Sequence, residues 1–270
     1  MVTTVISAKL TLAVRLVDTT TGAELTETDI RFYFNEERVY PMREGTGTYI
    51  FINMGKEDFL MRICACGYDD VELDINFDTL DPKLPFKDIF LMPSEKNIIG
   101  GAVIKISGNL PGLEFIEAID LSHPIAVFQG MTTGKDIPMM NLLPMTLAGG
   151  VALDPVAYAM LSNDRLRYEV FTVQEQADVT SVMLKTQLKF KHEFNEKIFR
   201  IIYGRAGPEG DFILKVRDDE DVHDYLLFFR AGGREYIRPI DFHLETGEID
   251  LTKGSKEQVT LEGKEEVKDE

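Results

Sequence analysis

The sequence is poor in the residues that disulfide-rich and membrane-spanning proteins depend on. It has only two cysteines, Cys64 and Cys66, and no run approaching 18 uninterrupted apolar residues. On an extended strand the Cα atoms of residues i and i+2 lie about 6.5 to 7 Å apart, at the outer limit for a disulfide. We therefore expect free thiols, a reducing compartment and no transmembrane segment.

An export signal is also missing from the sequence. Residues 1–17 have no cationic start, and Lys9 and Arg15 interrupt their apolar residues in an alternation typical of a strand. The expected location of the protein is cytoplasmic.

Basic residues are scarce relative to acidic ones. The chain has 29 Lys and Arg against 46 Asp and Glu, which gives a net charge of −17. Such a surface repels phosphate backbones and anionic lipid, so nucleic acid and membranes are disfavoured as partners. Basic partners and other protein subunits remain open.

Catalytic and metal-binding motifs are absent as well. There is no His-Glu-x-x-His, Gly-x-Ser-x-Gly or Gly-x-Gly-x-x-Gly sequence, and the four histidines, at positions 123, 192, 223 and 243, are scattered. Zinc would need two more ligands beside Cys64 and Cys66. We expect no catalytic residue, cofactor or metal, and we interpret His192 as a core-edge residue of a strand over Val182 to Phe194 with one hydrogen bond.

Three local patterns imitate ligand-binding motifs without completing them. Gly130 to Lys135 is one residue too short between its glycines for a nucleotide-binding loop and lacks the following Ser or Thr. Asp74, Asn76 and Asp78 lack the later glycine and glutamate of a calcium loop. The run Asp218 to Asp221 is more typical of a solvated hairpin loop than of a cation site. Each is predicted to be ordinary strand or loop.

What the sequence does have is a clear strand alternation. In Phe59 to Ala65, Met61 and Ile63 share one face, and in Val71 to Phe77 apolar and polar residues alternate. One face of this predicted strand pair is therefore buried and the other solvated. Turns arrive about every 8 to 12 residues through the first third of the chain, which is the spacing expected of a β-sandwich.

The same region resembles a known family. The order Val17-Asp18 to Thr21-Gly22, then Gly47 to Phe51, then Phe59-x-Met61-x-Ile63-x-Ala65-x-Gly67-Tyr68 is similar to the carboxypeptidase regulatory-like domain, over roughly residues 8–92. The resemblance implies a transthyretin-like sandwich that serves as a structural or docking module, with no catalytic residue.

The whole chain is predicted to be all-β with little helix, in four parts. Residues 1–95 are expected to form the transthyretin-like sandwich, and residues 96–162 a connector rich in Met, Gly and Pro. Asp154-Pro155 resembles a helix start and predicts a short helix over Val156 to Leu161. Residues 163–252 are expected to form a second antiparallel β domain, and residues 253–270 a solvated charged tail.

Four methionines of the connector are candidate partner-binding residues: Met131, Met139, Met140 and Met145. Methionine adapts to irregular apolar surfaces, so these residues either pack between domains or contact a partner.

The function that these patterns favour is a non-enzymatic structural or adaptor role within a larger assembly, for example a phage-tail-like or contractile injection apparatus. Its partners would be other protein subunits, including copies of the same chain. One alternative is a carbohydrate- or surface-binding module, which the lack of any Trp disfavours. Another is a hydrolase with an interdomain site at His223 or His243.

Overall fold

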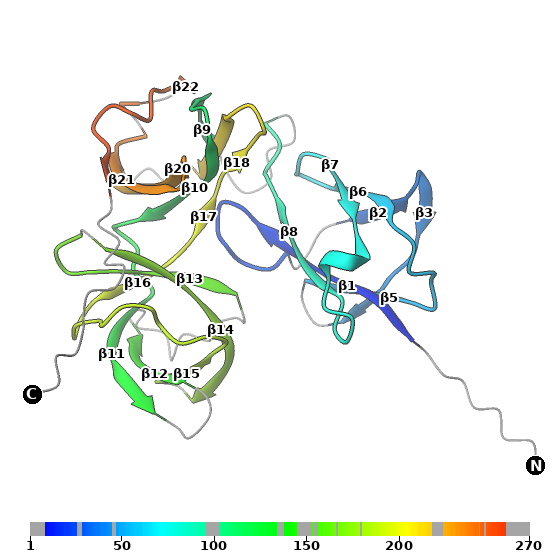
Figure 1. The fold of residues 1–270 in the computed structure, drawn as a ribbon, viewed down its shortest axis with the longest axis horizontal. Coiled ribbons are helices and arrows are strands. Elements are labelled where there is room, and N and C mark those ends of the chain that lie inside the picture. Colours follow the sequence, from blue (N-terminus) through cyan, green and yellow to red (C-terminus); the bar gives the residue numbers. More distant parts are fainter. Residues whose placement is uncertain are drawn as a thin grey trace, which may run out of the picture. The chain divides into compact units, whose positions relative to one another are not determined.

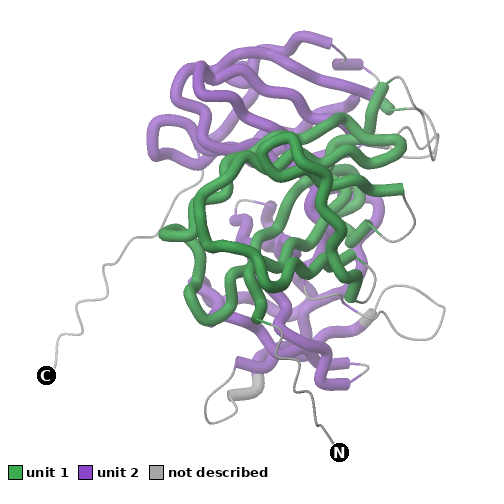
Figure 2. The backbone as a smooth tube through the Cα atoms, turned by 90° about the vertical axis from the view of Figure 1, so that its right-hand side faces the viewer, with its two compact units in different colours: residues 1–103 green, residues 104–270 purple. Residues whose placement is uncertain are grey.

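The computed structural model describes residues 9–25, 29–44, 47–95, 103–133, 138–144, 153, 156–165, 167–178, 180–217, 224–242, 244–245 and 247–257. Within these ranges the regular structure is strand, apart from one 3-10 helix, η1 (Phe77–Thr79). The predicted all-β fold is confirmed. The chain divides into two compact units, residues 1–103 and 104–270 (Figure 2).

Unit 1 is a sandwich of two four-stranded sheets (Figure 1). One sheet has the order β4-β5-β1-β8, in which β8 runs parallel to β1, and the other has the order β3-β2-β6-β7. The strands are β1 (Leu10–Asp18), β2 (Ile30–Phe34), β3 (Glu37–Val39), β4 (Met42–Glu44), β5 (Thr48–Ile52), β6 (Phe59–Ala65), β7 (Val71–Ile75) and β8 (Phe86–Leu91).

The core of unit 1 follows the predicted alternation. β6 and β7 pair antiparallel with Met61 opposite Leu73, and Met61 and Ile63 are fully buried. The two sheets meet through aromatic rings, for example Phe32 of β2 and Phe51 of β5, whose centroids lie 5.4 Å apart. Apolar residues of both sheets therefore form a single core.

A buried aspartate ties one sheet of unit 1 to the corner of the other. The carboxylate of Asp18, at the end of β1, accepts hydrogen bonds from the Thr20 backbone N–H (2.7 Å) and hydroxyl. It also accepts one from the hydroxyl of Tyr68 at 2.7 Å, and Tyr68 lies in the corner between β6 and β7. Because the carboxylate accepts several hydrogen bonds, its burial does not leave its oxygens without donors.

Unit 2 is a second sandwich interrupted by a barrel (Figure 1). One sheet of this interrupted sandwich has the order β17-β10-β20-β21-β23, and the other β18-β19-β9-β22. Its strands are β9 (Val103–Asn109), β10 (Leu113–Asp120), β17 (Ile202–Tyr203), β18 (Arg205–Ala206), β19 (Asp211–Arg217), β20 (Tyr225–Ala231), β21 (Arg234–Ile240), β22 (Gly247–Glu248) and β23 (Lys256–Glu257).

The barrel lies in the sequence between β10 and β17. Its six strands close in the order β11-β12-β15-β14-β13-β16, and β16 pairs with both β11 and β13. They are β11 (Ala126–Thr133), β12 (Pro138–Pro144), β13 (Ala157–Leu161), β14 (Tyr168–Asp178), β15 (Ser181–Leu184) and β16 (Lys197–Arg200).

The five-stranded sheet of unit 2 is buried on both faces. On one face Leu227 and Phe229 pack in a cluster with Phe212 of the other sheet of the sandwich. On the opposite face Phe228 and its neighbours pack in a cluster with Phe199 and other residues of the barrel. The candidate site described below lies on this barrel side.

Three sequence-based expectations need correction. The short helix expected over Val156 to Leu161 is strand β13, and its apolar run is buried because the side chains pack alternately inside the barrel and against the five-stranded sheet. The strand expected over Val182 to Phe194 ends at Leu184, and residues 185–196 form an irregular segment. Residues 96–162, expected to be a connector, supply strands β9 to β13.

Candidate functional site

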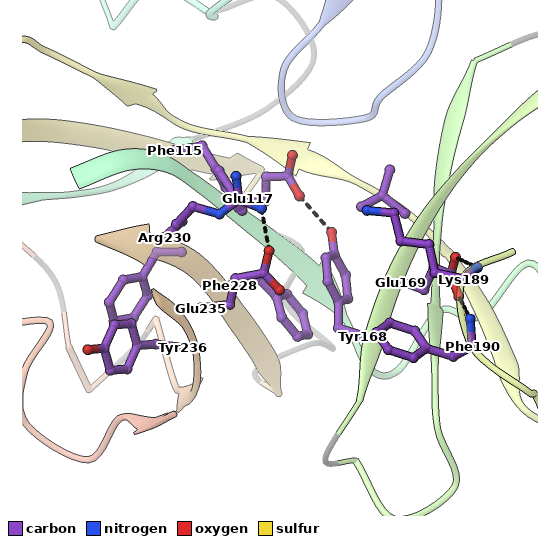
Figure 3. Close-up of a pocket in the computed structure, with 12 residues that line it drawn as sticks. Phe115, Glu117, Tyr168, Glu169, Lys189, Phe190, Phe228, Arg230, Glu235 and Tyr236 are labelled. Atoms are coloured by element: carbon purple, nitrogen blue, oxygen red, sulfur yellow. Dashed lines mark hydrogen bonds and ion pairs between the residues drawn. The ribbon is translucent and has the colours of Figure 1, made fainter. Parts of the chain in front are cut away.

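A pocket of about 260 Å³ opens on the barrel side of the five-stranded sheet (Figure 3). The sheet lines it with side chains of β10, β20 and β21, and the barrel with β14 and the 185–196 segment. Its lining combines aromatic rings with both acidic and basic groups. They include Phe115, Glu117, Tyr168, Glu169, Lys189, Phe190, Phe228, Arg230, Glu235 and Tyr236.

Glu117 is the unusual residue of the pocket. Strand alternation places it between Phe115 and Ile119 on one face of β10, and Phe228 is its cross-strand neighbour on β20. The hydroxyl of Tyr168, from β14 of the barrel, donates a hydrogen bond to its carboxylate at 2.7 Å. On β10, Glu117 is thus a carboxylate between two apolar residues of the same strand face.

The surroundings change the acidity of both partners. Burial raises the pKa of Glu117, and the Glu235 carboxylate raises it further, against the opposing effects of the Tyr168 hydrogen bond and Arg230. Burial and the neighbouring Glu117 hold the pKa of Tyr168 well above its ordinary value. Tyr168 therefore stays protonated as a donor, and its ring stacks on Phe228 with centroids 3.5 Å apart.

Arg230 closes one end of the pocket. It lies between Phe115 and Glu235 in one cross-strand row, with its guanidinium 5.2 Å from the centre of the Phe115 ring. It forms a hydrogen-bonded ion pair with Glu235 and lies 3.7 Å from a Glu114 oxygen. Its charge is therefore already engaged by two carboxylates.

A buried Glu-His-Glu triad lies beside the pocket. His192 Nε2 is 2.8 Å from an oxygen of Glu169, and Nδ1 is hydrogen-bonded to Glu196. The three side chains are only 4%, 5% and 1% exposed, respectively. Glu169 also accepts hydrogen bonds from the backbone N–H groups of Lys189 and Phe190. The triad thus fixes the part of the 185–196 segment that lines the pocket.

The two carboxylates of the triad favour the charged form of His192. Burial alone would lower the pKa of His192, but the hydrogen bonds and charges of Glu169 and Glu196 outweigh burial and raise it. Both ring nitrogens then carry protons and donate to carboxylates. The sequence-based interpretation of His192 as a strand residue with one hydrogen bond is wrong, because its alternation hid a partner 23 residues away on β14.

A second candidate site is the edge segment of unit 1, residues 37–44. It contains β3 and β4, each of which is one of the two edge strands of its sheet. Tyr40, between them, is 78% exposed, and Met42 on β4 is 58% exposed. The guanidinium of Arg38 lies 4.9 Å from the centre of the Tyr40 ring. The edge segment therefore presents two sheet edges and two large apolar side chains together.

The four methionines predicted to bind a partner do not share one environment. Met140 on β12 is fully buried in the barrel core, whereas Met131, its neighbour in register on β11, is 38% exposed. Met139 is half-buried, and Met145 lies outside the described residues. Met131 and Met140 are cross-strand partners, but only Met140 is enclosed by the barrel core.

Most of the incomplete motifs have local structural roles. The side chain of Asn76 accepts the Asp78 N–H at 2.8 Å and caps η1. Gly130 has a φ of 123° beside a bulge in β11. Cys64 and Cys66 are free, as expected. His123 is 61% exposed and lies 2.7 Å from an oxygen of Asp120.

The remaining motif residues lie outside the described part of the chain. These are Gly134, Lys135, Asp218 to Asp221, His223 and His243. Among the residues that the structure does describe, there is no group of three or more His, Cys, Asp or Glu suited to a metal ion. Within the same described residues, no helix has the length and apolar character needed to cross a membrane.

The polar pocket residues were not predicted as a site from the sequence: Glu117, Tyr168, Arg230 and Glu235. One signal was available, because Phe115, Glu117 and Ile119 share one face of β10 and only Glu117 is charged. A lone charge on an apolar strand face marks a group that needs a partner.

No family model matches the chain, and a search of characterised proteins finds no match.

Proposed function

We propose that the protein is a non-enzymatic structural or adaptor protein that acts through contacts with other protein subunits of a larger assembly. The observation that carries this proposal is the edge segment of unit 1, residues 37–44, which combines the outer strands of both sheets with the exposed side chains of Tyr40 and Met42. We propose that an extended strand of a partner subunit pairs with this segment.

The physical argument begins with the backbone. The outer side of an edge strand carries N–H and C=O groups without a neighbouring strand, and it pairs readily with another chain. In strand addition the main-chain hydrogen bonds supply affinity, while side chains beside the edge supply specificity. Tyrosine is enriched among the residues that dominate binding energy, and methionine adapts to irregular apolar surfaces.

Other features fit such a role. The resemblance of residues 8–92 to carboxypeptidase regulatory-like domains favours a docking module, and phage-tail-like or contractile injection machines are one kind of assembly that uses small sandwich domains. Two free thiols favour a cytoplasmic location. Pairing between copies of the edge segment would give a homo-oligomer.

The test compares the wild-type chain with a Tyr40→Ala/Met42→Ala double variant. We measure self-association by sedimentation velocity and co-purifying subunits by quantitative affinity capture from native lysate. The wild type is expected to form a defined complex, and the double variant to weaken it at least about tenfold, as expected for losing two central contacts.

Leu84→Ala is the matched control, because Leu84 is also exposed in unit 1 but lies outside the edge segment. It should leave the complex unchanged. A strictly monomeric wild type without a specific partner, or a double variant that binds as well as the wild type, would contradict the proposal.

A further inference from the structure

We propose that the pocket of unit 2 receives one basic side chain, lysine or arginine, from a partner protein, with its positive charge against Glu117. This inference rests on the proposed function in one respect, since it names a contact that a partner subunit would make. The probes described below test it without any partner.

One carboxylate of the pocket, that of Glu117, has no hydrogen-bonded cation among the described residues. Of its three carboxylates, Glu235 is paired with Arg230, and Glu169 accepts hydrogen bonds from His192 and from two backbone N–H groups. Within the described residues, Glu117 receives a hydrogen bond from the neutral hydroxyl of Tyr168. Glu117 is therefore the carboxylate that still lacks a hydrogen-bonded cation.

Burial makes ionisation of the Glu117 carboxylate costly. A carboxylate on a packed, largely apolar sheet face is expensive to ionise unless an opposite charge lies close to it. Folding alone would favour an apolar residue at position 117, as at Phe115 and Ile119 on the same strand face. A cation bound beside Glu117 would offset this cost.

The volume and lining of the pocket also suit a basic side chain. Its volume of about 260 Å³ lies below the range of about 300–1,000 Å³ usual for pockets of drug-sized ligands, which suits one side chain better than a larger molecule. Phe190 offers a partly exposed ring, and Val170 an exposed apolar side chain. Lysine and arginine combine an apolar stem with a charged head, and aromatic rings attract such cations.

The charge of the whole chain supports the same occupant. A net charge of −17 attracts basic partners over distances of the order of the Debye length and raises their rate of encounter. An anionic occupant fits less well. It would meet Glu117, and Arg230 is already engaged by Glu235 and Glu114.

The experiment uses the full chain and four small probes: the Nα-acetyl amides of lysine, arginine, norleucine and glutamate. Binding is measured by NMR chemical-shift titration and calorimetry. One or both cationic probes are expected to bind with Kd of millimolar order, and norleucine and glutamate at least about tenfold more weakly. Since the bound cation favours ionised Glu117, binding should release protons and strengthen as Glu117 ionises.

Glu117→Gln is the decisive variant, because glutamine can still accept the Tyr168 hydrogen bond but carries no charge. It should weaken the cationic probe at least about tenfold. Glu175→Gln, an exposed position on β14, should change nothing. If Glu117→Gln failed to fold, the preference of the wild type for lysine over norleucine would still decide.

Four results would overturn the inference: no binding of either cationic probe, equal binding of norleucine, preferred binding of glutamate, or undiminished binding by Glu117→Gln. The edge-segment test is independent of these results. If the probes bind without selectivity but the complex still depends on Tyr40 and Met42, this inference alone is rejected. If the probes bind selectively but the complex does not depend on Tyr40 and Met42, the proposed strand pairing alone is rejected.

Discussion

Glu117 and His192 hold charge within unit 2 in two different ways. His192 lies between two carboxylates, and both of them share its imidazolium as a hydrogen-bonded counter-charge. Glu117 has a neutral tyrosine hydroxyl as its hydrogen-bond donor. Removing one partner of a buried ion pair is costly, whereas removing an uncompensated charge relieves a cost. Substitutions at the two positions should therefore change stability in opposite directions.

The first prediction is that His192→Leu destabilises unit 2 by about 3–5 kcal/mol at pH 5.5, the cost of leaving buried charges unpaired. The pKa of His192 is raised in the folded protein. Its stabilisation is therefore complete below the unfolded value of about 6.5 and is lost as pH rises through the folded value. Urea unfolding from pH 5.5 to 9 should show the penalty shrinking with pH.

His123→Leu is the control for this prediction. His123 also lies beside a carboxylate, but it is 61% exposed, so its ion pair contributes little. We expect a change within about 1 kcal/mol at every pH. A His192→Leu penalty that is equally small, or that grows with pH, would show that the triad does not hold a charged histidine.

The second prediction is that Glu117→Gln raises stability at pH 7 by about 0.5–2 kcal/mol, the range usual for stabilising substitutions. The pKa of Glu117 is raised in the folded protein. The folded state thus binds a proton that the unfolded chain has released, so stability falls as pH rises from about 4.3 through the folded value. Urea unfolding at pH 7 and 4 should show the gain disappearing in acid. A destabilised variant at pH 7 would contradict this.

At the scale of strands, simple alternation predicts the elements that bury one face. β6 and β7 match their predicted limits closely because one side faces the core of unit 1 and the other faces solvent. β13 breaks this rule, since the barrel buries one face and the five-stranded sheet buries the other. A short apolar run that is buried on both sides has no alternation of apolar and polar residues to identify it as a strand. The helix was predicted from the preceding Asp154-Pro155 alone, and that prediction was wrong.

The prediction of a strand over residues 185–196 is wrong for a different reason. Its residues alternate like a strand, but the backbone N–H groups of Lys189 and Phe190 are taken by the carboxylate of Glu169 rather than by a neighbouring strand. Contacts of this kind join residues 20 and 21 positions apart. They arise only once β14 is in place, so local pattern cannot reveal them.

The pocket is equally invisible to local pattern. The sequence offers one clue, the lone charge of Glu117 on an apolar strand face. Its donor Tyr168 is 51 residues away, and the strands that supply Arg230 and Glu235 follow the entire barrel. A site assembled from both sides of an inserted domain needs the tertiary structure to be recognised.

The third prediction concerns the barrel strands β11 and β12. Met140→Ala should destabilise unit 2 by about 2–5 kcal/mol, because it opens a cavity in the barrel core. Met131→Ala is the matched control, with the same substitution on the neighbouring strand at a 38% exposed position, and should cost much less. Urea unfolding of both variants gives the comparison. Equal costs would mean that Met140 does not pack in the core.

At the scale of the whole molecule, each unit has its own core. The core cluster of unit 1 is formed by residues between Leu12 and Leu91, and the clusters of unit 2 by residues between Ile106 and Leu251. Units with separate cores can unfold in separate steps.

The fourth prediction is therefore that Met61→Ala lowers the melting temperature of one thermal transition and leaves the other unchanged. Met61 is fully buried in unit 1, so its truncation should cost about 2–5 kcal/mol there. Met42→Ala, at an exposed position of the same unit, should shift neither transition appreciably. Scanning calorimetry distinguishes these outcomes. A single transition that shifts as a whole would show that the units unfold together.

The insertion of the barrel also shapes how the chain assembles as it leaves the ribosome. β10 is synthesised early, but its main partner β20 emerges only after the six barrel strands. Once the barrel closes, Ala126 is paired with Ile198, so the ends of this long intervening stretch are brought together. The entropic cost of pairing β10 with the later strands then falls to the cost of closing a short loop. A substitution in the barrel core that slows closure of the barrel should therefore also slow folding of the interrupted sandwich, although the sandwich has a different core.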